Sequence, residues 1–133
     1  MTHPNDAESA TPRVPKARSG PLHLLDATRY SVAGFRRLLR ESAARQELAL
    51  GGIGLAVIIL AGGSAGHVIG FLVLLAALLA AEALNTAIEV LADHLSPDWS
   101  QMAKDAKDLG SLAVGLLVLA NLAFVGAVVL GMI

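Results

Sequence analysis

A long stretch without charge limits the folding of this chain more than any other feature of its sequence. Between Glu47 and Glu82 there is no Asp, Glu, Lys or Arg, and none follows Asp108. A helix that crosses a bilayer needs about 20 mostly apolar residues. We expect three such helices over residues 48–65, 68–91 and 109–133, the second of which is interrupted near its end by polar residues.

The composition agrees with a membrane protein. Hydrophobic residues make up 55% of the chain and charged residues 16%, whereas about a quarter of an ordinary soluble domain is charged. The chain has no cysteine, which excludes disulfides and thiolate metal sites. We therefore predict an all-α membrane protein and expect no nucleic-acid partner.

The segment before the first predicted span has two parts. Residues 1–21 are rich in Pro, Ser, Thr and Ala, which predicts a disordered N-terminal tail. Residues 22–45 have the pattern of an amphipathic helix, which we expect to lie in the membrane interface with its arginines near the phosphates. The apolar face of this helix consists of Leu25, Val32, Phe35 and Leu39.

The basic residues predict the orientation in the membrane. Eight of the ten Lys and Arg residues precede Gln46, and the other two are Lys104 and Lys107. Cytoplasmic segments carry an excess of positive charge. The N-terminus and the 96–108 loop are therefore expected in the cytoplasm, and the C-terminus outside.

A stripe of polar side chains ends the second predicted span, in the segment "EALNTAIEVLAD" (82–93). At about 100° per residue, Asn85, Glu89 and Asp93 lie roughly -60°, -20° and +20° from Glu82 around the helix. Ionisable groups at membrane depth are costly and usually functional. A wet helix end explains Asp93 well and Glu82 least, so Glu82 is the candidate for proton abstraction.

A second polar motif, "AKDAKDLGS" (103–111), follows the loop. Ser96 and Pro97 have the pattern of a helix start, with Ser96 as N-cap. Lys107 and Asp108, next to the carboxylate stripe, suit a site for a magnesium nucleotide. The chain contains no G-x-x-x-x-G-K-[ST] phosphate loop.

Together these motifs resemble the signature of the small integral-membrane prokaryotic diacylglycerol kinases, a family that includes undecaprenol kinases. The resemblance covers 82–93, "AKDLGS" (106–111), "ESAARQE" (41–47) and "RYSVAG" (29–34). It implies an ATP-dependent lipid kinase in the bacterial inner membrane. It also implies a helical-bundle homotrimer of three-span subunits that uses Mg²⁺ with ATP as co-substrate.

The resemblance also implies roles for single residues. Glu82 matches the catalytic base that takes the proton of the lipid hydroxyl. Asn85 matches a polar residue near the reacting groups, and Ser111 matches a lipid-side position. The ATP-site positions match Tyr30, Glu41, Glu89, Asp93, Lys107 and Asp108, of which Glu41 and Glu89 match the metal carboxylates.

Two alternatives to a diacylglycerol kinase remain at this point. Within the family, undecaprenol also presents one hydroxyl at the interface, and the Ser96–Trp99 loop, "SPDW", leans toward the undecaprenol kinases. Outside the family, a single intramembrane Glu is typical of a small proton-coupled transporter. The transporter explains Glu82 but not the other charged residues at the same depth.

Overall fold

The computed structural model describes residues 21–133, so the tail predicted over 1–21 lies almost entirely outside the described residues. The chain divides into two units, 1–32 and 33–133, which are described separately. Helix α1 (Pro21–Leu38) begins in the first unit and ends in the second. Its apolar side chains Leu25, Val32 and Phe35 are exposed, as the prediction of an interfacial amphipathic helix requires.

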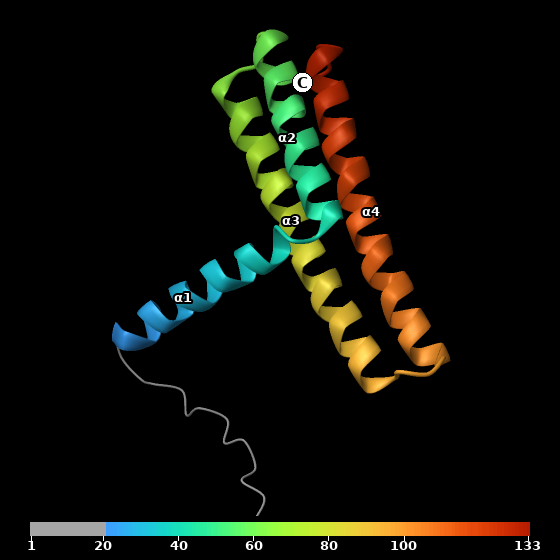
Figure 1. Cartoon of the computed structure of the whole chain (residues 1–133). Helices are drawn as coiled ribbons and strands as arrows, with labels where there is room; N and C mark the ends of the chain where they lie inside the picture. The colour runs from blue at the N-terminus through green and yellow to red at the C-terminus, as the bar shows by residue number, and fades with distance from the viewer. Residues whose placement is uncertain (1–20) are drawn as a thin grey trace, which may run out of the picture. The chain divides into compact units, whose positions relative to one another are not determined.

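The second unit contains three long apolar helices (Figure 1). They are α2 (Ser42–Leu60), α3 (Ala65–Leu95) and α4 (Gln101–Val129). Each is long and apolar enough to cross a membrane, which confirms the prediction of an all-α protein with three spans. Helix α3 packs along α4, and α2 packs on both. The lower parts of α3 and α4 in Figure 1 form a hairpin that extends beyond α2.

The interior of the bundle is small and its surface is apolar. The buried side chains of Ile58, Phe71 and Val128 form the core, one from each helix. Large apolar side chains such as Leu60, Leu72 and Leu119 are exposed. A water-soluble protein of this size would bury more of its apolar surface, so the helices are built to face lipid or other helices.

The helix expected over residues 22–45 is wrong at its C-terminal end. Helix α1 ends at Leu38 and α2 begins at Ser42, with Glu41 as its N-cap. The Arg45 guanidinium donates hydrogen bonds to the carbonyl oxygens of Leu39 (3.2 Å) and Arg40 (2.8 Å). These bonds stabilise the break because carbonyls after a helix end lack helical partners. The first span therefore starts earlier than residue 48.

The predicted start of the third helix is also wrong. Ser96 is the C-cap of α3, and α4 begins only at Gln101, where the Ser100 hydroxyl accepts a hydrogen bond from the Ala103 amide (3.4 Å). Pro97 ends α3 because proline has no amide hydrogen and its ring clashes with the preceding turn. The α3–α4 loop is thus only five residues long, from Ser96 to Ser100. Helix α3 extends beyond the predicted span 68–91 at both ends, whereas α4 begins before the predicted span 109–133 and ends earlier, at Val129.

Candidate active site

The polar stripe of α3 runs from the buried interior to the surface. Glu82 and Asn85 are 5% and 8% exposed, whereas Glu89 and Asp93 are exposed. This gradient follows the helix toward the α3–α4 hairpin, and it matches the order expected from the sequence. A buried carboxylate therefore stands at the inner end of a polar stripe that opens to solvent.

Carboxylates from two helices gather around Glu82. Its charged neighbours include Glu89, further along α3, and Glu41, the N-cap of α2. Glu41 itself forms an ion pair with Arg37. In the described part of the chain, no Lys or Arg forms an ion pair with Glu82 or Glu89. Acidic groups therefore outnumber basic ones in this cluster, which suits a cation or a hydroxyl group that gives up its proton.

Glu47 belongs to this cluster, although our sequence analysis did not select it as a site residue. It is 9% exposed and its charged neighbour is Glu82. Its Oε2 has no hydrogen-bond partner among the described residues. A signal was present in the sequence, because Ala44, Glu47, Gly51 and Ile58, all buried, follow the helical period on one face of α2.

Asn85 connects the buried and exposed parts of the stripe. Its Nδ2 donates a hydrogen bond to Glu89 Oε1 (3.2 Å). Its Oδ1 is buried and has no partner among the described residues. The amide packs against Gly110 of α4, where a Cβ would collide with Asn85 Oδ1. The glycine of "KDLGS" is thus required for the close approach of α4 to the polar stripe.

We expect Gly110→Ala to reduce turnover by about tenfold, because the added methyl group displaces the Asn85 amide and loosens its bond to Glu89. Steady-state kinetics of the purified variant would measure this. Gly115→Ala is the matched control, since a Cβ at position 115 meets nothing within 4 Å. Full activity of Gly110→Ala would contradict a role for the position of Asn85.

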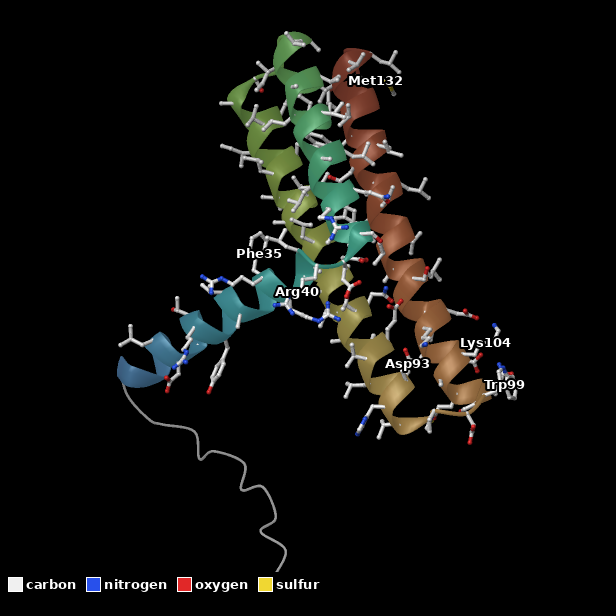
Figure 2. The ribbon with its side chains drawn as sticks, viewed as in Figure 1. Phe35, Arg40, Asp93, Trp99, Lys104 and Met132 are labelled. Carbon is white, nitrogen blue, oxygen red and sulfur yellow. The ribbon has the colours of Figure 1, made fainter. Side chains whose placement is uncertain are left out.

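Two ion pairs link the charged residues of the hairpin. Lys107 of α4 pairs with Asp93 of α3, and Lys104 pairs with Asp108 one turn along α4. Asp93 projects from α3 toward α4, and Lys104 lies on α4 near the loop that carries Trp99 (Figure 2). The structure therefore brings Asp93 and Lys107 together, and it places Asp108 beside an exposed lysine.

Two further residues were predicted for the site, Ser111 and Tyr30. Ser111 follows Gly110 on α4 and is exposed. Tyr30 belongs to the first unit and its side chain is 69% exposed. Nothing in the structure tests the roles predicted for these two residues, which stay predictions.

The sequence of this chain is similar to the sequences of known proteins. The sequence matches the prokaryotic diacylglycerol kinase family over residues 29–130. The chain belongs to this family. A protein of Sinorhizobium sp. named diacylglycerol kinase is 36% identical over 132 residues, which cover 94% of this chain and 95% of that protein. A diacylglycerol kinase of Pseudomonas aeruginosa is 36% identical over 99 residues, covering 74% of this chain and 80% of that protein.

Membership of the diacylglycerol kinase family confirms the predicted resemblance and favours a lipid kinase over the transporter. The match begins at residue 29 and ends at 130. It thus includes the part of α1 that carries Tyr30, and all of the acidic cluster. The match therefore reaches all the helices that carry the predicted site residues.

Glu41 and Glu89 are the residues that could hold a metal ion in this diacylglycerol kinase. Within residues 21–133, no group of three or more His, Asp or Glu side chains is arranged to hold a metal ion. Mg²⁺ usually keeps several waters and binds one or two carboxylates together with substrate phosphates. Glu41 and Glu89, which both act on Glu82 electrostatically, supply carboxylates of this kind.

Proposed function

We propose that the protein is a membrane diacylglycerol kinase that transfers the γ-phosphate of ATP to the hydroxyl of diacylglycerol and gives phosphatidic acid. The observation that carries this proposal is the burial of Glu82 among Glu41, Glu47 and Glu89, where the apolar part of α3 ends. A lipid that keeps its tails in the bilayer presents its hydroxyl near this depth. The names of the two relatives support diacylglycerol rather than undecaprenol as substrate.

In the proposed reaction Glu82 is the general base. Its carboxylate accepts the proton of the lipid hydroxyl while the hydroxyl oxygen bonds to the γ-phosphorus, and the bond from this phosphorus to the bridging oxygen of ADP breaks. Phosphoryl transfer depends mainly on positioning and charge stabilisation. Burial excludes water from Glu82, and the Asn85–Glu89 hydrogen bond holds the neighbouring carboxylate in place.

Magnesium would be held by Glu41 and Glu89 together with the phosphates, and it would supply charge neutralisation of the transferred group. Arg37 restrains Glu41 at the start of α2 through their ion pair. Lys107 and Asp93 then form the outer part of the nucleotide site. Asp108, which pairs with Lys104 on α4, is proposed to belong to this site as its match in the family implies. Tyr30 and Ser111 are proposed to contact the nucleotide and the lipid, as their matches in the family imply.

The orientation and assembly of the protein are part of the proposal. The basic residues of α1 and of the α3–α4 hairpin support a cytoplasmic site in the bacterial inner membrane, with the C-terminus outside. The exposed apolar side chains of α3 and α4 support packing against further copies, and the family resemblance favours a homotrimer. In such an assembly, side chains of the packed helices would bind the nucleotide, so that no phosphate loop is needed.

Transfer of labelled γ-phosphate from MgATP tests the proposed function. The purified protein in mixed micelles is offered diacylglycerol and undecaprenol separately. Label in phosphatidic acid alone is the expected result. Label in undecaprenyl phosphate alone would change the substrate, and a folded protein that labels neither lipid would contradict the kinase.

Lys107→Met is expected to raise the KM for ATP by about tenfold, because the side chain no longer offsets phosphate charge. The matched control is Lys107→Arg, which keeps the positive charge at this position. Steady-state ATP titrations at saturating lipid would compare the two. An equal rise in both variants would mean that the shape of the side chain, and not its positive charge, is responsible.

A further inference from the structure

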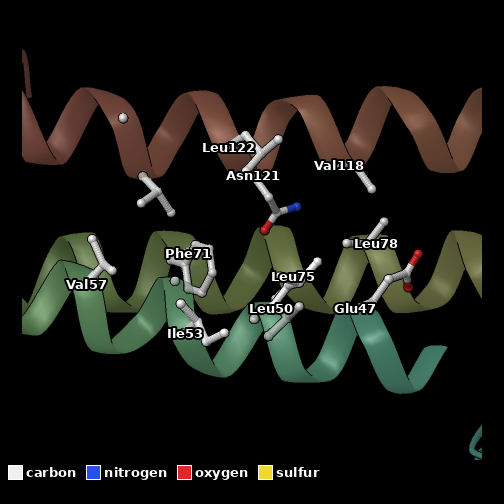
Figure 3. A pocket seen from close by; sticks show the side chains of 14 residues that line it. Glu47, Leu50, Ile53, Val57, Phe71, Leu75, Leu78, Val118, Asn121 and Leu122 are labelled. Atoms are coloured by element: carbon white, nitrogen blue, oxygen red, sulfur yellow. The ribbon is translucent and has the colours of Figure 1, made fainter. Parts of the chain in front are cut away.

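A groove runs along α2, α3 and α4 (Figure 3). Its volume is about 390 Å³, and α2, α3 and α4 all contribute to its walls. The wall is almost wholly apolar. Glu47 and Asn121 are its polar side chains, and an oxygen of each lacks a hydrogen-bond partner among the described residues.

One end of the groove lies at the candidate active site. Glu47 lines this end, with Leu78 and Val118 near it in Figure 3, and the charged neighbour of Glu47 is Glu82. A lipid hydroxyl at Glu82 would therefore lie beside the entrance. The groove is therefore linked to the candidate site through Glu47, which lines the groove and has Glu82 as its charged neighbour.

The other end lies deep among apolar side chains. Val57 and Phe71 line it (Figure 3), and Val125 faces Gly54 there. Gly126 follows Val125 on α4, roughly 12 Å along the helix from Val118 at 1.5 Å per residue. The groove therefore runs from the polar cluster into the part of the bundle that crosses the hydrocarbon.

Glycine at position 126 keeps this end open. Gly126 lines the groove, and no atom outside its own helix backbone lies within 4 Å of the place a Cβ would take. Asn121 stands midway along the wall, where its Nδ2 donates to the carbonyl oxygens of Leu117 (2.8 Å) and Leu74 (3.2 Å). Because these bonds hold Asn121 in place, the shape of the groove is fixed on both helices.

We propose that this groove holds one acyl chain of the lipid substrate and that the open space at Gly126 accommodates the far part of a long chain. The inference rests on the proposed function, since it takes the lipid hydroxyl to lie at Glu82. A diacylglycerol whose hydroxyl faces Glu82 must direct its hydrocarbon away from the carboxylates. The groove offers apolar contact in that direction and in continuity with the site.

The test compares short-chain (dioctanoyl) and long-chain (dioleoyl) diacylglycerol as substrates of Gly126→Leu. We expect the leucine side chain to fill the far end of the groove, because the place of its Cβ has no neighbouring atom within 4 Å. Gly115→Leu is the matched control, because Gly115 also lies on α4 with nothing near its Cβ position and does not line the groove. Gly126→Ala gives a smaller obstruction if the leucine variant assembles poorly.

For Gly126→Leu, we expect kcat/KM for the long-chain lipid to fall by about tenfold or more, while the value for the short-chain lipid stays within about threefold. Each methylene group that loses apolar contact weakens binding by about fourfold. Gly115→Leu should leave the ratio of the two substrates unchanged.

Equal losses on both lipids, together with a changed particle size in detergent, would overturn the proposal and assign the groove to a helix of a neighbouring copy. An unchanged substrate ratio with normal assembly would also overturn it. In both cases the wild-type protein would still phosphorylate lipid, so the proposed function would stand. A wild-type protein inactive on both lipids would overturn the proposed function as well.

Discussion

Glu82→Gln is expected to lower turnover by about 10²- to 10⁴-fold, the range that general base catalysis contributes. The amide has the size of the carboxylate and can occupy the same buried site, but it cannot accept the proton of the lipid hydroxyl. Insertion and assembly should persist, because Glu82 forms no ion pair in the described part of the chain. Turnover in mixed micelles at saturating MgATP and diacylglycerol is the measurement, with particle size in detergent as the check on assembly.

Glu47→Gln provides the comparison that isolates the base. This substitution removes a second buried carboxylate from the same cluster and leaves the proposed proton acceptor, Glu82, unchanged. We expect it to keep far more activity than Glu82→Gln. Equal losses in the two variants would mean that the total negative charge of the cluster matters, and near-normal activity of Glu82→Gln would remove it from the role of base.

Glu89→Gln is expected to raise the magnesium concentration needed for half-maximal activity by about 10- to 100-fold. Loss of one carboxylate ligand weakens the binding of the metal ion. Changes in the surroundings of a metal site commonly lower the affinity for the metal by about this factor. The amide oxygen of the new side chain can still accept the hydrogen bond that Asn85 Nδ2 donates to Glu89 Oε1. The position of the side chain should therefore persist, so the effect isolates the charge. Magnesium titrations at fixed, saturating ATP and lipid would measure it.

Asp93→Asn is the matched control for the magnesium titration. Asp93 lies one turn beyond Glu89 on the same stripe but pairs with Lys107, so its loss should affect ATP binding more than the magnesium requirement. An unchanged magnesium titration in Glu89→Gln would exclude metal ligation by this residue. An equal shift in both variants would indicate general electrostatic attraction of the cation by the stripe.

Some of the predicted boundaries were wrong because local patterns do not show how a helix ends. The sequence over 22–45 contains no Gly later than Gly34 and no Pro, so nothing in it marks the break after Leu38. The break depends on the Arg45 hydrogen bonds to the Leu39 and Arg40 carbonyls. Ser96 and Ser100 are equally good N-caps by residue type, and the structure places α4 after the second.

The three spans and the order of the polar stripe on α3 could be predicted from the residues without a structure. Hydropathy is enough to predict the spans because a bilayer requires about 20 apolar residues in each crossing helix. The fixed rotation per residue of an α-helix is enough to predict the order of the polar stripe. The fold was needed to show that Glu47 joins Glu82, that Gly110 contacts Asn85 and that Lys107 pairs with Asp93. These are contacts between helices, and they depend on which faces pack together and at what height, which spacing along one helix does not specify.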